Sequence, residues 1–329
     1  MISTQISPKR ILLDSRDYPF LSLTAASSLL FIPAAIYFFT HPHFHSALAA
    51  IYLALIFLVY LGPFTLMLHN LCHRPAFQPR YKWIKHYVFW ILGPIFGQTP
   101  ETFYAYHIGM HHPENNLKND LSSTLSYQRD SLVDFSKYLG RFLAMGTLEL
   151  GIYLYKRRRF KLFRHILYGE LAFYSIATGT LFLNLRASVV VFWIPMVVVR
   201  IAMMLGNWTQ HAFIDSETPQ HVYRNSITCI ESVYNRRCFN DGHHIGHHLK
   251  MNLHWTEMPE DFEANREIYR EEKAIVFRKL DYFMIWTLLM TRRFGRLAQY
   301  FVDLEPVKRD RQEIIELLKS RLKPIQCQS

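Results

Sequence analysis

The sequence contains few cysteines and lacks the motifs that bind nucleotides. Its four cysteines, Cys72, Cys229, Cys238 and Cys327, form no Cys-x-x-Cys pair, so we expect free thiols in a reducing compartment rather than a disulfide framework. A glycine-rich phosphate loop and a dinucleotide fingerprint are also missing. Any redox chemistry would therefore need electrons from another protein.

Charge is almost absent from four long apolar stretches. Residues 21–39 and 47–68 contain no charged side chain, 166–185 contain only Glu170, and 188–206 contain only Arg200. At 1.5 Å per residue, such runs nearly cross a hydrocarbon core of about 30 Å. We predict four membrane spans in two hairpins, the second closed by a short link around Arg186. An intramembrane Arg200 either has a functional role or extends its charged end to the membrane surface.

Basic residues outnumber acidic ones, which gives a net charge of +11 and a pI of about 9.4. This balance fits nucleic acid, a membrane surface or the cytosolic loops of a membrane protein, and the apolar runs select the last. The link 40–46 has no Lys or Arg, whereas 69–165 carry fourteen and 207–329 carry eighteen. Because positive loops favour the cytoplasmic side, we predict cytosolic termini and cytosolic large segments, with no nucleic-acid partner.

The predicted fold is an all-α integral membrane protein with a cytosolic helical cap. Residues 87–97 are apolar but too short to span, which favours an interfacial or re-entrant helix, and 131–155 indicate an amphipathic surface helix. Helical spacing of apolar residues continues over 274–304, and 311–322 resemble a short amphipathic helix. The domains we expect are a cytosolic segment 1–20, a membrane domain 21–260 and a cytosolic helical region 261–329.

Histidines gather in four clusters on the predicted cytosolic side. The clusters are His69 and His73; His107, His111 and His112; Asn207 with His211; and His244, His247 and His248. Side chains four residues apart share a helix face, and imidazole is the commonest protein metal ligand. A tetrahedral zinc needs about four ligands, so nine imidazoles imply two metals with open positions. Imidazole suits Zn, Cu, Fe and Ni.

Two familiar histidine motifs are missing. No histidine has Glu three residues earlier, unlike the ligands of soluble di-iron bundles. His69 and His73 have the spacing of a zinc protease, but Asn70 stands where that motif has its general base. Asp120, Asn115 and Asp241 are candidates to orient ligands by hydrogen bonds.

The clusters resemble the histidine boxes of membrane fatty-acid desaturases, a di-iron superfamily. His69-x-x-x-His73 is similar to the first box, His107-x-x-x-His111-His112 to the second and His244-x-x-His247-His248 to the third. Asn207-x-x-x-His211 resembles an extra element of stearoyl-CoA desaturases, in which His is a ligand and Asn reaches metal through water. The resemblance covers roughly residues 20–260. His243 stands where the family often has Tyr, so the choice between His243 and His244 stays open.

The resemblance implies two iron ions, O₂ as cosubstrate, and a lipid or acyl-thioester substrate that acquires a double bond. It also implies an external electron donor, of the cytochrome b5 or ferredoxin type, and a location in the endoplasmic reticulum or a bacterial inner membrane. The implied ligands are His69, His73, His107, His111, His112, Asn207, His211, His244, His247 and His248, with His243, Asp241 and Arg200 as further candidates. Alternatives are a lipid or sterol hydroxylase or alkane monooxygenase, a membrane zinc hydrolase, and a haem or transport protein.

Overall fold

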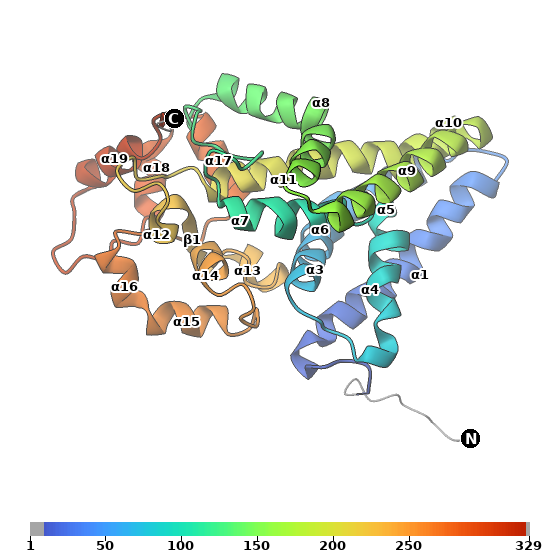
Figure 1. The fold of residues 1–329 in the computed structure, drawn as a ribbon, viewed down its shortest axis with the longest axis horizontal. Helices are drawn as coiled ribbons and strands as arrows, with labels where there is room; N and C mark the ends of the chain where they lie inside the picture. The colour runs from blue at the N-terminus through green and yellow to red at the C-terminus, as the bar shows by residue number, and fades with distance from the viewer. Residues whose placement is uncertain (1–9, 327–329) are drawn as a thin grey trace. The chain divides into compact units, whose positions relative to one another are not determined.

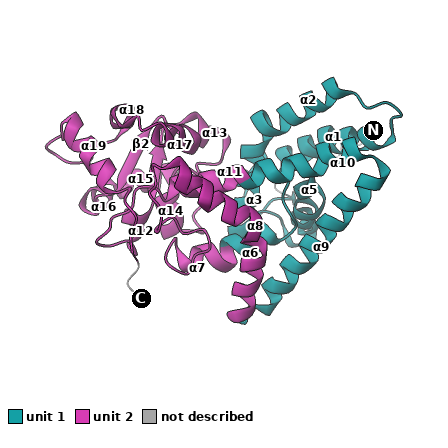
Figure 2. Cartoon of the chain, turned by 90° about the horizontal axis from the view of Figure 1, so that it is seen from above, with its two compact units in different colours: residues 1–107, 157–200 teal, residues 108–156, 201–329 magenta. Residues whose placement is uncertain are grey.

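The structure, a computed structural model, describes residues 10–326, and these are mostly helical (Figure 1). Of the four cysteines, Cys327 lies outside the described residues; Cys72, Cys229 and Cys238 are free thiols, as predicted. The chain divides into two compact units (Figure 2). Unit 1 takes the described residues up to 107 together with 157–200, and unit 2 takes 108–156 and the described residues from 201 onwards.

Four helical stretches are long and apolar enough to cross a membrane, which confirms the four predicted spans. They are Ser15–Thr40, Ser46–His73, Phe160–Leu183 and Leu185–Gln210. The link between the last two is Asn184, whose side chain accepts a hydrogen bond from the Ala187 amide and caps the following helix. The predicted link around Arg186 is therefore wrong, because Arg186 lies in the first turn of that helix. The pairing into hairpins and the cytosolic cap stay predictions.

Unit 1 consists of these spans and of shorter helices between them. Its elements are η2 Ser15–Asp17, α1 Tyr18–Thr40, α2 Ser46–Ala54, η3 Leu55–Tyr60, α3 Leu61–His73, η4 Pro79–Tyr81, α4 Trp83–Tyr87, η5 Val88–Leu92, α5 Gly93–Ile95, α6 Thr102–Tyr106, α9 Phe160–Leu183, α10 Leu185–Ser188 and η7 Val189–Trp193. The predicted helix at 87–97 corresponds to α4, η5 and α5. Inside the unit, Phe64 stacks on Phe96 at 3.9 Å between ring centroids, whereas Leu58 and Phe182 are largely exposed, as lipid-facing side chains would be.

Unit 2 holds the remaining elements, two of which begin in unit 1. They are η6 His107–His111, α7 His112–Glu114, α8 Leu132–Lys156, α11 Ile194–Gln210, α12 Val222–Asn225, β1 Ile227–Ile230, α13 Val233–Arg237, α14 His244–Leu249, α15 Met258–Ala264, α16 Arg266–Glu271, β2 Ile275–Arg278, α17 Tyr282–Met290, α18 Phe294–Tyr300 and α19 Arg311–Ser320. The helices predicted over 131–155 and 311–322 correspond to α8 and α19. A capping box at Asp310 starts α19.

A two-stranded parallel sheet in unit 2 departs from the predicted all-α fold. β1 and β2 pair in the register Ile227 to Ile275 and Ile230 to Arg278. The expectation of helical structure over 274–304 is therefore wrong at its start. The four residues Ile-Val-Phe-Arg are β-branched or aromatic at three positions and are buried at those three, the environment that favours a strand. Helices α17 and α18 follow, and their apolar faces join β2 in the main core of unit 2.

Candidate metal centre

Four histidines of unit 2 converge, and we call them the quartet: His111, His211, His244 and His248. One ring nitrogen of each lies within 4.8 Å of those of the others. The Nε2 atom of His244 lies 3.0 Å from Nε2 of His248 and 3.4 Å from Nε2 of His211. Two facing imidazole nitrogens can share only one proton, so lone pairs are left directed into the same small volume. A cation bound by four imidazoles would satisfy them.

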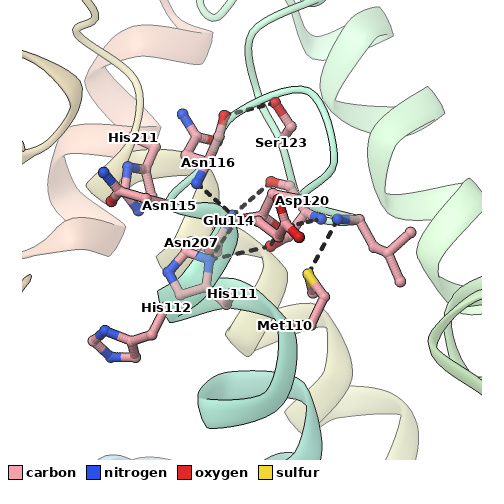
Figure 3. Close-up of polar contacts among 12 residues, drawn as sticks. Met110, His111, His112, Glu114, Asn115, Asn116, Asp120, Ser123, Asn207 and His211 are labelled. Atoms are coloured by element: carbon pink, nitrogen blue, oxygen red, sulfur yellow. Dashed lines mark hydrogen bonds and ion pairs between the residues drawn. The ribbon is translucent and has the colours of Figure 1, made fainter. Parts of the chain in front are cut away.

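Hydrogen bonds at the other ring nitrogen set the orientation of two members. The Nδ1 atom of His111 lies 2.8 Å from Oδ2 of Asp120. Figure 3 draws the hydrogen bonds around these two side chains as dashed lines. The Nδ1 atom of His211 lies 2.8 Å from the backbone carbonyl of Asn225. Both partners are acceptors, so Nδ1 carries the proton in each ring and the lone pair is on Nε2. Metal-binding histidines generally have a partner of this kind.

Burial keeps quartet members neutral. Burial lowers the pKa of His211, and with the added effect of the neighbouring His111 this pKa is about 4. Burial also holds the pKa of His248 well below its ordinary value, with His112 and His111 adding to the effect. A neutral imidazole retains the lone pair that a metal needs. The quartet therefore fits a transition metal ion in geometry, and His211 and His248 also fit it in protonation.

Asp120 is the centre of a buried hydrogen-bond network beneath His111. Its carboxylate accepts hydrogen bonds from the backbone amide of Asn116 at 2.8 Å and from both the backbone amide and the hydroxyl of Ser122. Although burial alone would raise the pKa of Asp120, His111 and Ser122 hold it below its usual value. The side chain of Asn116 also donates to Asn225 at 2.9 Å. The partners of His111 and His211 thus belong to one network.

A glycine determines where α14, and with it His244, begins. A Cβ atom on Gly242 would lie 2.2 Å from Oδ1 of Asn235 and 2.6 Å from the carbonyl of Cys229. The Gly242 amide donates to Asn235, and its carbonyl accepts from the Cys229 amide in β1. At Gly242 the backbone that leads into the fourth histidine cluster therefore lies too close to its neighbours for any side chain.

Five other predicted histidines form two smaller sets. The triad, His69, His73 and His107, lies in unit 1, with Nε2 of His73 2.8 Å from Nε2 of His107 and the rings of His69 and His107 4.5 Å apart. The pair, His112 and His247, lies in unit 2, with 3.1 Å between their Nε2 atoms. Each set alone has fewer imidazoles than a tetrahedral metal site requires.

Two histidines four residues apart belong to the same set in one cluster and to different sets in another. His244 and His248 share a face of α14 and both belong to the quartet, as expected. His107 and His111 have the same spacing and lie in the π-helical η6, but they belong to different sets.

Two residues left open by the sequence lie outside the quartet. His243 packs its ring 5.9 Å from that of Phe262, and burial lowers its pKa to about 4. Asp241 accepts a hydrogen bond from the Tyr234 hydroxyl at 2.7 Å. Of the adjacent pair, His244 is therefore the one that joins the other histidines.

Two polar residues of the last span have protein partners. The side-chain nitrogen of Asn207 donates to the carbonyl of Ser122 at 2.9 Å and to the Tyr138 hydroxyl at 2.8 Å. Arg200 lies 3.5 Å from Glu170 in unit 1. The role of Asn207 as a ligand through water stays a prediction.

Sequence reasoning did not identify Asn225 as the hydrogen-bond partner of His211, because a contact through a backbone carbonyl leaves no signal in a sequence. It did identify Asp120 as a possible partner of a ligand, and the bond to His111 confirms that contact. Asn70, at the position of a protease base, donates its amide to the carbonyl of Leu66 in its own helix at 2.8 Å. It has no lone pair basic enough to activate water.

Comparison with known proteins gives one match. The model of the family described as fatty acid desaturase matches residues 42–280, which include all four histidine clusters. No curated protein and no solved structure matches the chain.

Proposed function

Because this chain belongs to the fatty acid desaturase family, we propose that it is an O₂-dependent, di-iron enzyme that introduces a double bond into an acyl chain. The family implies an oxidoreductase that acts on a lipid, and the four apolar helices are those of a membrane protein. The finer parts of the proposal are the two iron ions, the desaturation itself and an electron donor of the cytochrome b5 or ferredoxin type.

The observation that carries the proposal is the quartet. Its four histidines come from three separate clusters, and their nitrogens lie within 4.8 Å of one another. Such a cluster of buried imidazoles is costly unless a proton or a metal satisfies the lone pairs. We propose His111, His211, His244 and His248 as the ligands of one iron. The triad and the pair contain the other five histidines among the predicted ligands.

The residues of the chain would hold the metal rather than perform the chemistry. Bound iron would supply the O₂ activation that removal of hydrogen from an unactivated methylene requires. Asp120 and the Asn225 carbonyl keep the protons of His111 and His211 on Nδ1, and so keep both rings aimed at the metal. Burial of His111, His211 and His244 would limit the access of water to the reacting atoms.

The sequence supports the orientation and the location that we propose. Basic residues are concentrated in the segments that carry the histidines, and the link 40–46 has none. This distribution supports cytosolic histidines, in the endoplasmic reticulum or a bacterial inner membrane. An electron donor on the same side could then reach the site. Asn70 favours this reading over the zinc hydrolase, since its amide cannot act as a base.

The test is metal and product analysis of the full-length protein purified in detergent, wild type beside His248→Ala. We expect two irons per wild-type chain and a clear loss in the variant. With a reducing system and O₂, lipid products should be lighter by two hydrogens. His221→Ala is the matched control, because His221 is a half-exposed histidine whose ring stacks on Tyr223.

Three results would contradict the proposal. Zinc alone in the wild type would support the hydrolase. Products heavier by one oxygen would support the hydroxylase or monooxygenase. Iron retained in full by His248→Ala would remove the quartet from the metal site.

A further inference from the structure

A buried acidic residue in the third span of unit 1 binds the loop that precedes α6. Oε1 of Glu170 accepts hydrogen bonds from the hydroxyl of Thr99 at 2.5 Å and from the hydroxyl of Thr102 at 2.7 Å. Its other oxygen lies 3.5 Å from Nη2 of Arg200, and both side chains are mostly buried. A charged residue is costly in a membrane span unless it is paired. Arg200 is the intramembrane charge for which the sequence left a functional role and a position at the membrane surface both open.

The loop that Glu170 holds has a backbone that needs outside support. Glu101 has a φ of 63°, in the left-handed region, which is unfavourable for a residue with a side chain. Helix α6 begins directly after it, at Thr102, and no side chain caps its first turn. A helix of five residues is not stable by itself. Its start is therefore determined by contacts with other elements.

Those contacts come from two neighbouring segments of unit 1. Gly169 lies so close to Pro100 that a Cβ atom on it would be 1.8 Å from the Pro100 carbonyl. The indole of Trp90 donates to Glu101 at 3.1 Å, and His165 lies 3.7 Å from the same carboxylate. Helix α9 thus contacts the loop through His165, Gly169 and Glu170.

Helix α6 leads directly to a predicted metal ligand. His107 follows Tyr106, the last residue of α6, and stacks on Phe103 with ring centroids 5.5 Å apart and planes 5° from parallel. Phe103 is the second residue of the helix. The position at which α6 begins therefore determines where the Phe103 ring lies, and His107 stacks on that ring. A shift of the loop would move His107 relative to His73, which is 2.8 Å away.

We propose that Glu170 is a positioning residue: through Thr99 and Thr102 it fixes the start of α6 and thereby the place of His107 in the metal site. Arg200, in the fourth span, balances the charge of Glu170 in the third. The inference rests on the proposed function, since it requires that His107 bind a metal ion. Neither Glu170 nor Arg200 touches the reacting atoms.

The experiment compares iron release to a chelator from the purified full-length protein. In Thr102→Val the side chain keeps its shape but loses the hydroxyl. We expect one of the two ions to leave about tenfold faster, the size typical of lost indirect ligand support. The ion of the quartet, in unit 2, should leave at the wild-type rate. Thr102→Ser keeps the hydroxyl and should release both ions as the wild type does.

Two further variants separate positioning from a general structural effect. Thr40→Val is the matched control, because that hydroxyl bonds only to the Ile36 carbonyl of its own helix among the contacts described. The double variant Glu170→Ala with Thr102→Val should release iron no faster than Glu170→Ala alone, since both changes remove the same hydrogen bond.

The outcomes distinguish this inference from the proposed function. Wild-type release kinetics in Thr102→Val, or equal acceleration of both ions, would overturn the positioning role and leave the function intact. A wild-type protein that contains no iron would instead overturn the proposed function, and the inference with it.

Discussion

Nδ1 of His111 lies 2.8 Å from Oδ2 of Asp120, and both side chains are almost completely buried. The carboxylate therefore has no solvent to replace His111 as a partner. Three further hydrogen bonds fix its position: one from the backbone amide of Asn116, and two from the backbone amide and the hydroxyl of Ser122. The orientation of this histidine is consequently built into the protein before any metal binds.

Substitution of Asp120 by Asn should weaken metal binding. The amide retains the size of the side chain but loses the charge that holds the Nδ1 proton, so we expect affinity to fall about 10–100-fold. Equilibrium competition with a chelator measures this directly. The control is Asp310→Asn, because Asn caps a helix about as well as Asp does at that position. An unchanged affinity in Asp120→Asn would show that the contact does not support the ligand.

The adjacent residues His243 and His244 should respond differently to alanine substitution. His244→Ala removes a nitrogen that lies 3.0 Å from that of His248, and should lose the metal of the quartet. His243→Ala removes a ring that packs on Phe262, so it should keep the metal and lower stability only. Metal analysis of the two variants side by side checks this, and metal loss in His243→Ala alone would reverse the assignment.

The buried guanidinium of Arg129 should be essential for the stability of unit 2. It donates hydrogen bonds to six backbone carbonyls, those of Thr124, Leu125, Tyr127, Ala212, Arg321 and Lys323. Burial lowers its pKa to about 9, so it remains charged at pH 7. Arg129→Met leaves buried acceptors without a donor and should cost about 3 kcal/mol or more.

The measurement is the thermal unfolding midpoint in detergent. We expect a decrease of roughly 6–12 °C for Arg129→Met. Arg141→Met is the control, because that side chain is more than half exposed and pairs with Glu149 at the surface, where an ion pair contributes little. Equal midpoints for the two variants would mean that the carbonyls find other donors.

The four spans could be predicted because a run of about 20 mostly apolar residues with at most one charge has few other structures open to it. β2 could not, because a short run such as Ile275–Arg278, with three apolar residues, fits a strand or a buried helix equally well. The histidines that share a metal set were also only partly predictable. His244 and His248, four residues apart, belong to one set, whereas His107 and His111 have the same spacing and belong to different sets.

The remaining features depend on contacts between distant segments. Asn225 contributes through its backbone carbonyl, and Glu170 matters because Thr99 and Thr102 lie beside it. Neither relationship has a local sequence pattern. The sequence therefore indicates which residue types form clusters, whereas hydrogen-bond partners require the fold.

The thiols of Cys229 and Cys238 should resist alkylation in the folded protein. Both are buried. Burial raises the pKa of the Cys238 thiol to about 12, with Asp241 adding to the effect and Arg237 opposing it; burial also raises the pKa of Cys229. At pH 8 the thiolate fraction of Cys238 is then about 10⁻⁴, so iodoacetamide should label both residues only after denaturation, as mass spectrometry of their peptides would show.

The same shift gives a pH dependence with a definite sign. The folded-state pKa of Cys238 lies above that of an unfolded thiol, about 8.5, so folding favours the protonated form. This contribution to stability is complete below about pH 8.5 and decreases as the pH rises towards 12. The unfolding free energy should fall over that interval in the wild type and less in Cys238→Ala. Rapid labelling of native Cys238 at pH 8, or an identical alkaline loss in both proteins, would contradict the buried position of this thiol.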